Sequence, residues 1–264
     1  MRLSGLYLYP VKSLGGIQVN QWPLDELGLA LDRRWMVVDR EGRFLTQRQH
    51  PKMALIRPAL DDEGRLTLRH PKLPALHVPP APVEAATMAV QVWQDRVEAL
   101  RVGDAPDTWL RRALGIHCHL VWLPPGTHRA VDPEYAPGAI TSFTDGFPLL
   151  LIGEGSLAEL NARLQQPVSM RRFRPNLVVS GSEPFAEDHW RRIRIGQVEM
   201  EVVKPCSRCV VTTVDPDTGI PQGPEPLRTL ATFRRRDNKV YFGQNVVHRG
   251  PGRLRVGDTV QVIA

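Results

Sequence analysis

The chain has 264 residues and a hydrophobic content of 42%, enough to bury the core of one large domain or of two modest ones. Lys and Arg outnumber Asp and Glu by 34 to 28, so the surface should attract small anions. The basic residues are scattered and no nucleic-acid-binding motif accompanies them, so we expect no nucleic-acid partner.

Residues 1–13 lack the basic-then-apolar order of a secretory signal, and no apolar run approaches the length of a membrane span. The three cysteines are an odd number, which argues against a disulfide framework and for a reducing compartment. We therefore expect a globular cytoplasmic protein without a membrane span, whose thiols are free or bound to a metal.

Short runs of β-prone residues, separated by Gly, Pro and Asp, make up most of the chain. The predicted strands cover residues 6–9, 35–38, 44–46, 66–68, 149–152, 176–179, 198–203, 210–214, 240–242 and 260–263. Because so many short strands would leave unpaired edges in an open sheet, we expect closure into a barrel.

Three helices interrupt the strands. The first covers residues 107–114 and should end at Gly115. The second, over residues 156–165, opens on a Ser-x-x-Glu capping box, and the third carries Pro226 in its first turn. These helices should pack against the sheets.

Residues 71–86 are rich in Pro and Ala and should form a surface connection, and a looser break falls around residues 124–137. The predicted fold is mainly β with a few helices, of the α+β class. We expect a β-rich N-terminal domain over residues 1–125 and a β-barrel domain over residues 126–264.

The sharpest motif is Cys206-Ser207-Arg208-Cys209, which Lys204 precedes. Nearby cations favour a thiolate over a thiol, and a thiolate is the form that a nucleophile or a metal ligand requires. A single thiolate that binds a cofactor metal is one interpretation. Inert cysteines at a turn are a second, which the flanking charges disfavour.

Two further interpretations of this motif remain open. A thioredoxin-like dithiol requires a helix directly after the motif, whereas β-branched residues follow here. Zinc requires two more ligands, and the remaining candidates are His117, Cys118 and His119, which a strand would point to opposite faces.

Several other motifs occur in a fixed order. They are Tyr9-Pro10-Val11-Lys12-Ser13, Asp32-Arg33-Arg34-Trp35, Thr46-Gln47-Arg48-Gln49, Asp145-Gly146-Phe147-Pro148, Phe173-Arg174-Pro175-Asn176, Asp215-Pro216-Asp217-Thr218-Gly219, Phe242-Gly243-Gln244-Asn245 and Val256-Gly257-Asp258. With the cysteine motif, this set resembles the MOSC family over nearly the full chain, and within it the mitochondrial amidoxime reducing component and bacterial reductases of N-hydroxylated bases.

The resemblance implies a molybdenum-molybdopterin cofactor, with Cys209 as the metal ligand and Cys206 as a neighbour that does not bind the metal. The residues that it implies for cofactor binding are Lys12, Ser13, Arg33, Asp145, Arg174, Asn176, Ser207 and Arg208. Converging cations suit a phosphate-bearing pterin. Where mitochondrial relatives have small hydroxyl residues this chain has Gly146 and Phe147, so we expect backbone contacts there.

Asp215 and Asp217 belong to a strong turn sequence, which favours a structural role. The alternative is a proton relay, because reduction of an N-hydroxyl group consumes protons.

The implied activity is reduction of N-hydroxylated bases, amidoximes and similar small molecules. Some bacterial relatives carry a C-terminal ferredoxin domain, whereas this chain has no further cysteines for an iron-sulfur cluster. We therefore expect a separate electron donor, either a ferredoxin, a flavodoxin or a cytochrome with its reductase. The alternative function is a sulfur- or molybdopterin-carrier module that uses the thiols of Cys206 and Cys209.

Overall fold

The computed structural model describes residues 1–79 and 86–264 and confirms the predicted fold class, mainly β with three α-helices. The α-helices are α1 (Asp104–Leu114), α2 (Glu154–Ala162) and α3 (Leu227–Phe233). Four short 3-10 helices are η1 (Pro51–Leu55), η2 (Met170–Phe173), η3 (Ala186–His189) and η4 (Val210–Thr213). Within the described ranges, no helix is both long enough and apolar enough to cross a membrane.

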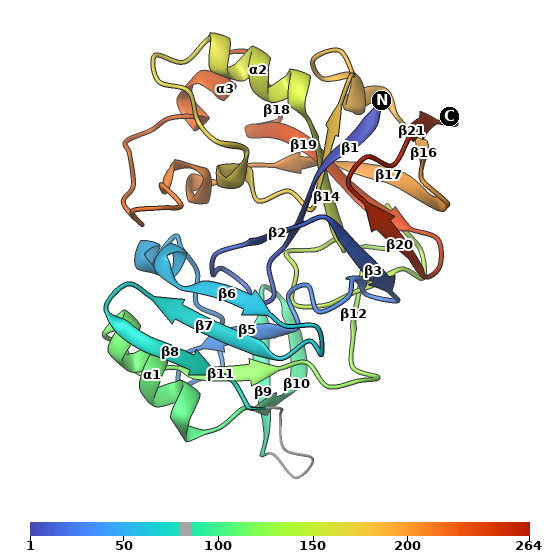
Figure 1. The fold of residues 1–264 in the computed structure, drawn as a ribbon. Helices are drawn as coiled ribbons and strands as arrows, with labels where there is room; N and C mark the ends of the chain where they lie inside the picture. The colour runs from blue at the N-terminus through green and yellow to red at the C-terminus, as the bar shows by residue number, and fades with distance from the viewer. Residues whose placement is uncertain (80–85) are drawn as a thin grey trace.

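A nine-stranded sheet forms the upper part of the molecule in Figure 1, with the order β2-β1-β15-β14-β19-β17-β16-β21 and β18 paired to β19. Its strands are β1 (Arg2–Leu8), β2 (Ile17–Val19), β14 (Leu149–Gly153), β15 (Leu177–Ser180), β16 (Arg192–Ile195), β17 (Val198–Ser207), β18 (Arg235–Arg236), β19 (Lys239–His248) and β21 (Val260–Val262). The parallel pair β14 and β15 is joined through α2, and the other pairs are antiparallel.

The first residues of the chain meet the last strand. The Leu3 amide donates to the Asp258 carbonyl at 2.9 Å, and the Val260 amide donates to the Met1 carbonyl at 3.0 Å. The sheet therefore curves round into a barrel-like shape, and both termini lie on the same side of the molecule (Figure 1).

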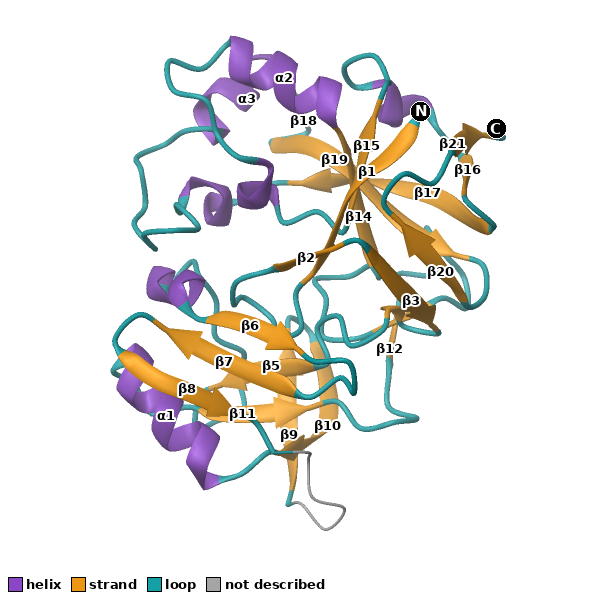
Figure 2. Ribbon diagram, viewed as in Figure 1, coloured by secondary structure: helices purple, strands orange, loops and turns teal. Residues whose placement is uncertain are grey.

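The lower part of Figure 2 contains two smaller sheets and α1. One sheet has the order β5-β11-β10-β9 and the other the order β6-β7-β8. Their strands are β5 (Trp35–Val38), β6 (Arg57–Leu60), β7 (Leu66–His70), β8 (Leu73–His77), β9 (Thr87–Val92), β10 (Asp95–Arg101) and β11 (His119–Trp122). The short pair β12 (Arg129–Ala130) and β13 (Ile140–Thr141) follows this part in the chain.

The earliest strands pair with the C-terminal half of the chain. β1 pairs with β15, and β3 (Gln21–Asp25) pairs with both β4 (Gly28–Leu29) and β20 (Gly252–Arg255). Residues 2–29 therefore share sheets with strands far along the sequence. The division at residue 125 stays a prediction about domains.

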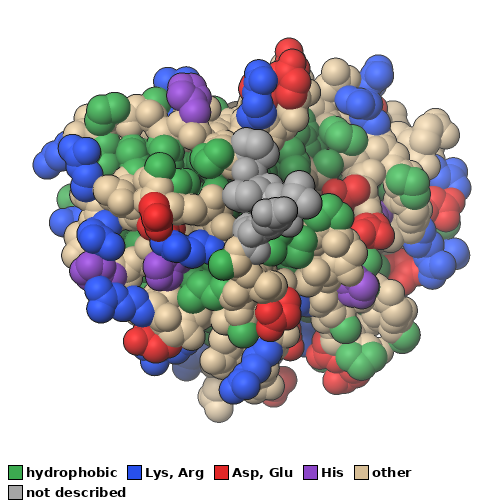
Figure 3. All heavy atoms as spheres, turned by 90° about the horizontal axis from the view of Figure 1, so that it is seen from below, with side chains coloured by type: hydrophobic (Ala, Val, Ile, Leu, Met, Phe, Trp, Pro, Cys, Tyr) green, Lys and Arg blue, Asp and Glu red, His purple; other side chains and the backbone are tan. Residues whose placement is uncertain are grey.

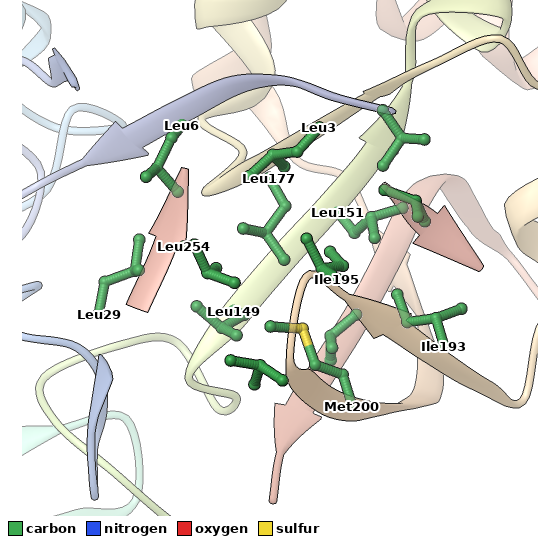
Figure 4. Packing of buried hydrophobic residues seen from close by; sticks show 14 of the residues in the cluster. Leu3, Leu6, Leu29, Leu149, Leu151, Leu177, Ile193, Ile195, Met200 and Leu254 are labelled. Atoms are coloured by element: carbon green, nitrogen blue, oxygen red, sulfur yellow. The ribbon is translucent and has the colours of Figure 1, made fainter. Parts of the chain in front are cut away.

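Separate apolar cores support the two parts. The large sheet buries Leu, Ile, Val and Met side chains on its inner face, and Figure 4 shows side chains from different strands gathered there, such as Leu6 of β1, Leu149 of β14 and Ile195 of β16. Two further clusters fill the lower part, one of them beneath α1. By contrast, the surface in Figure 3 mixes basic and acidic side chains, in accord with the scattered charge of the sequence.

The predicted strand over residues 210–214 is wrong, because η4 occupies these positions. The Thr212 hydroxyl donates to the Cys209 carbonyl at 3.0 Å, and the Thr213 hydroxyl donates to the Val210 carbonyl at 2.8 Å. These bonds to the carbonyl three residues earlier stabilise a tight turn and override the β-propensity of the side chains. Residues 44–46 also form no strand, since Phe44 makes a single bridge to Val38.

The predicted capping box is wrong as well. α2 begins at Glu154 and ends at Ala162, and its N-cap is Gly153. The Ser156 hydroxyl instead donates to the buried Glu187 carboxylate at 2.7 Å, so a tertiary contact takes the group that the pattern assigned to a cap. The end of α1 is confirmed, because Gly115 adopts the left-handed conformation (φ 75°) after Leu114.

The Pro-rich connection over residues 71–86 is partly wrong. Residues 73–77 form β8, an edge strand, and an edge tolerates Pro74 because one side of the strand needs no amide donor. Residues 80–85 of the predicted connection lie outside the described residues.

Leu151 is fully buried in the core of the large sheet. We expect Leu151→Ala to lower the free energy of unfolding by about 2–5 kcal/mol, because the lost methyl groups leave a cavity. Urea titration measures the change. Val262→Ala, at a side chain that is 43% exposed, should change it by less than about 0.5 kcal/mol. Equal losses in both variants would contradict the assigned core.

Candidate functional site

The predicted cofactor-binding residues come together around one cavity of about 150 Å³. Its wall includes Lys12, Ser13, Arg33, Asp145, Arg174, Asn176, Cys206, Ser207, Arg208 and Cys209. These residues come from loops after β1, before β5, after β13 and before β15, and from the end of β17. Segments far apart in the sequence therefore build a single site.

Cys209 stands at the rim of this cavity as the N-cap of η4, directly after β17 ends at Ser207. Its thiol is exposed, whereas Cys206 is half-buried and its sulfur accepts a hydrogen bond from Arg208 Nη1 at 3.0 Å. The two thiols therefore differ in environment. Cys209 is the one that a metal ion or a substrate can approach.

Arg208 is fixed by the surrounding backbone. Its Nη2 donates to the Phe173 carbonyl at 2.5 Å, and its amide donates to the Val240 carbonyl at 2.7 Å. Its Nε is buried and has no hydrogen-bond partner among the described residues. A buried donor without a partner is costly, which fits a site that an anionic ligand completes.

Two further cations lie over the ring of Tyr9. The guanidinium carbon of Arg33 is 4.4 Å from the ring centre, and that of Arg174 is 4.2 Å from it. Burial raises the pKa of Tyr9 to about 12, so its phenol is neutral. Burial also lowers the pKa of Arg174 to about 10, which still leaves it charged at neutral pH.

Asn176 connects these cations to the fold. Its side-chain oxygen accepts from Arg33 Nη1 at 3.0 Å, and its amide nitrogen donates to the Tyr7 carbonyl at 3.1 Å and to the buried Asp32 carboxylate at 3.2 Å. Asp32 also accepts from Arg33. The amide of Asn176 is thus used within the protein, where it orients Arg33 toward the cavity.

Lys12 is a buried cation in the same wall. Its Nζ donates to the Phe143 carbonyl at 2.8 Å and to Asp145 at 2.6 Å. Burial lowers the pKa of Lys12 to about 8, although the charge of Asp145 opposes the shift. Burial would raise the pKa of Asp145, but the charge of Lys12 outweighs it and holds that pKa well below its usual range.

Three cavity residues have left-handed backbones although none is glycine. They are Ser13 (φ 65°), Arg33 (φ 49°) and Arg174 (φ 56°). This conformation costs of order 1–3 kcal/mol for such residues, and it recurs at ligand-binding sites because it directs side chains that regular structure would turn elsewhere.

The structure adds residues that the sequence motifs contained but that had no assigned role. Gln47 lines the cavity and donates to the Ser13 carbonyl at 2.7 Å, which holds that loop. Arg48 also lines it, with its guanidinium 4.5 Å from the ring centre of Trp93 and a buried Nε that has no partner in the described chain. Their place in the Thr-Gln-Arg-Gln motif was the signal that could have identified them.

Asp215 and Asp217 do not line the cavity. The Asp215 carboxylate accepts from the Thr218 amide at 2.9 Å, and Asp217 accepts from Arg57 at 2.9 Å and from Arg171. These contacts hold the loop that follows η4. They favour a structural role for the two aspartates over a proton relay.

Lys204 does not line the cavity that the two thiols line. Its Nζ is 3.8 Å from the ring centre of Tyr135 and also 3.8 Å from Asp132. An aromatic ring and a carboxylate therefore hold this cation, and the expected electrostatic effect of Lys204 on the thiols stays a prediction. The premise that a strand follows the cysteine motif is also wrong, since one turn of 3-10 helix follows it.

The zinc interpretation relied on residues 117–119. Cys118 is buried, and burial raises the pKa of its thiol to about 12, far from the thiolate that zinc requires. His119 Nδ1 pairs with Asp107 at 2.6 Å. Among the residues that the structure describes, no three His, Cys, Asp or Glu side chains form a group able to hold a metal ion.

Comparison with known proteins agrees with this arrangement. Residues 1–117 match the MOSC N-terminal beta barrel domain, and residues 139–261 match the MOSC domain. Mitochondrial amidoxime-reducing component 1 of Homo sapiens is 36% identical, over 99% of this chain and 82% of the relative. The chain belongs to the MOSC family.

Two other MOSC relatives differ in how much of them the chain covers. Mitochondrial amidoxime reducing component 2 of Rattus norvegicus is 35% identical, over 98% of this chain and 82% of the relative. Molybdenum cofactor sulfurase of Oryza sativa is 34% identical, over 92% of this chain and 32% of the relative. This MOSC chain thus matches part of a longer protein in the second case.

Gly146 leaves open space in the MOSC cavity, because a Cβ added there would meet nothing within 4 Å. We expect Gly146→Ser to change the unfolding free energy by less than about 0.5 kcal/mol. Gly243→Ser is the control, because Gly243 has φ 80° and a Cβ there would lie 2.8 Å from the Leu151 carbonyl. This substitution should lower the unfolding free energy by about 2 kcal/mol or more. Thermal unfolding compares the two, and a large loss at Gly146 would contradict the open space.

Lys12 gives the MOSC cavity a pH-dependent anion affinity. Lys12 is protonated below its pKa of about 8 and neutral above it, so sulfate affinity of the cofactor-free protein should fall between pH 7 and pH 9. Sulfate keeps a constant charge over this range, so calorimetric titration isolates the change in the protein. We expect Lys12→Met to weaken sulfate binding by about 1.5 kcal/mol at pH 7 and to make the sulfate affinity vary less with pH. If the sulfate affinity of this variant still fell as steeply between pH 7 and pH 9, Lys12 would be excluded as the source of the pH dependence.

Proposed function

We propose that this MOSC protein is a molybdenum-cofactor-dependent reductase of N-hydroxylated compounds, such as N-hydroxylated bases and amidoximes. The observation that carries the proposal is an exposed cysteine at the rim of a cavity with five cations in its wall. The cations are Lys12, Arg33, Arg48, Arg174 and Arg208. Relatives named amidoxime-reducing components, similar over nearly the whole chain, support it.

The residues present fit a phosphate-bearing pterin with a thiolate-bound metal. The buried Nε atoms of Arg48 and Arg208 have no partners in the described chain, and an anion would supply acceptors for them. We propose Cys209 as the metal ligand. The residues that would hold the pterin and its phosphate are Lys12, Ser13, Arg33, Asp145, Arg174, Asn176, Ser207 and Arg208.

When bound, the cofactor supplies a two-electron redox centre. The residues of the chain would bind the cofactor, orient it and neutralise its negative charge. Arg33 and Arg174 are held rigidly over Tyr9, so their charges need little rearrangement when an anion arrives. The pKa of Lys12 is about 8, so near neutral pH its Nζ carries a proton that it can donate to a group in the same cavity.

We further propose that electrons come from a separate protein, such as a ferredoxin, a flavodoxin or a cytochrome with its reductase. The three cysteines of this chain are fewer than the four that an iron-sulfur cluster usually takes. We propose a cytoplasmic setting, which the free state of Cys118, Cys206 and Cys209 supports.

Cys209→Ala tests the proposal directly. If Cys209 binds the metal, the variant should lose molybdenum and lower amidoxime reduction by at least a hundredfold, because the Cys206 thiol in the same wall is half-buried and bonded to Arg208 and cannot take its place. Elemental analysis and a steady-state assay on protein from a cofactor-competent host measure both. Cys206→Ser is the matched control and should keep molybdenum, since its hydroxyl can still accept from Arg208.

Full retention of metal and activity in Cys209→Ala would overturn the assignment. Mass spectrometry of the unmodified protein adds a separate outcome. Persulfide on either thiol without molybdenum would replace the reductase with the sulfur-carrier alternative.

A further inference from the structure

A second cavity of about 180 Å³ adjoins the first. Gln47, Arg174 and Val211 line both cavities, so these residues lie between the two. Val211 stands two residues after Cys209, in η4. The second cavity therefore lies next to the proposed metal ligand, and the proposed cofactor site does not use it.

The wall of this second cavity is strongly basic. Four arginines line it, Arg57, Arg171, Arg172 and Arg174, and no acidic residue among the described residues does. Two carboxylates that do not line the cavity contact these arginines: Asp217 accepts from Arg57 and Arg171, and Asp215 accepts from Arg172 at 3.3 Å. Four cations against two anions leave an excess of two positive charges around the cavity.

The four arginines differ in their freedom to move. Arg172 and Arg174 are held inside, by the Thr213 carbonyl at 3.1 Å and the Leu14 carbonyl at 2.6 Å. Arg57 and Arg171 have side chains that are 58% and 44% exposed. The inner pair thus provides fixed positive charge, and the outer pair can turn to form hydrogen bonds with a ligand.

Close packing shapes the opposite wall. A Cβ at Gly16 would lie 2.5 Å from the ring of Tyr9, and a Cβ at Gly15 would lie 3.1 Å from the Ile56 carbonyl. Both glycines line the cavity with Tyr7 and Tyr9. The space is thus a tyrosine-walled pocket beside arginines, which suits a flat organic molecule that carries a phosphate or a carboxylate.

We propose that this second cavity binds the oxyanion of the substrate, a phosphate or a carboxylate, while the N-hydroxylated end lies in the first cavity beside Cys209. The inference rests on the proposed function and narrows its substrate class to anionic N-hydroxylated compounds. The cofactor phosphate does not need the second cavity, because Lys12, Arg33 and Arg208 already converge in the first.

A pair of substrates that differ by one carboxylate tests selectivity. We expect cofactor-loaded enzyme to prefer para-carboxybenzamidoxime over benzamidoxime in kcat/KM, mainly through a lower KM. In Arg171→Gln the ratio of the two kcat/KM values should fall about tenfold, since one charge-assisted hydrogen bond to the oxyanion is lost.

Arg65→Gln is the matched control. Arg65 is 68% exposed, pairs with Asp61 at 2.6 Å and lines neither cavity. Its substitution should leave the substrate ratio unchanged. A ratio that stays constant in Arg171→Gln, or that falls equally in Arg65→Gln, would overturn the oxyanion site.

A binding measurement gives a readout apart from turnover. Sulfate titrated by calorimetry into the cofactor-loaded protein, in which the cofactor occupies the cations of the first cavity, should bind, and its affinity should weaken about tenfold in Arg57→Gln and in Arg171→Gln. Absence of sulfate binding to the loaded protein would also overturn the proposal. If neither amidoxime is reduced, the reductase assignment fails, and the sulfate titration still decides whether the cavity takes an anion.

Discussion

The contact of two arginines with one tyrosine organises the candidate site. Arg33 and Arg174 both lie over the buried ring of Tyr9, and like charges at such distances repel each other. Asp32 and Asn176 offset that repulsion by accepting from Arg33, and the Leu14 carbonyl accepts from Arg174. Tyr9 therefore positions two cations that would otherwise separate or turn to solvent.

This contact lies where the earliest strands join the large sheet. Tyr9 follows β1, Arg33 precedes β5 and Arg174 precedes β15. Pairing of β1 with β15 brings the first and third of these together, and the Asn176 side chain bonds to the Tyr7 carbonyl across the same junction. Neither half of the chain holds the site alone, so the strand pairing and the cavity depend on the same contacts.

Local patterns predicted most of the fold. β5 begins and ends where the run of β-prone residues placed it, and the Gly115 stop of α1 is confirmed, because the information for both is local. Predictions failed where a side-chain hydroxyl bonded to a partner other than the one that the sequence pattern assigned to it. Ser156 bonds to Glu187 rather than capping α2, and the hydroxyls of Thr212 and Thr213 make a turn from a β-prone run.

The candidate site was predicted mainly from the ordered set of motifs, and less from the spacing of residues within a single motif. Spacing alone did not separate Cys206 from Cys209, and only the structure gives them different exposure. Lys204 turned out to contact Tyr135, since the direction of a long side chain depends on tertiary neighbours. The second basic cavity was not predicted from the sequence, because Arg57 and Arg171 lie far apart in the chain. The fold brings them together, where both donate to Asp217.

The pairing of β1 with β15 has a consequence for synthesis, because the two strands lie far apart in the sequence. β1 leaves the ribosome long before β15 has been made. Until then β2 covers only one edge of β1, and the other edge is open to pairing with other chains. Chaperone binding to the nascent chain during this interval thus bears on the yield of folded protein.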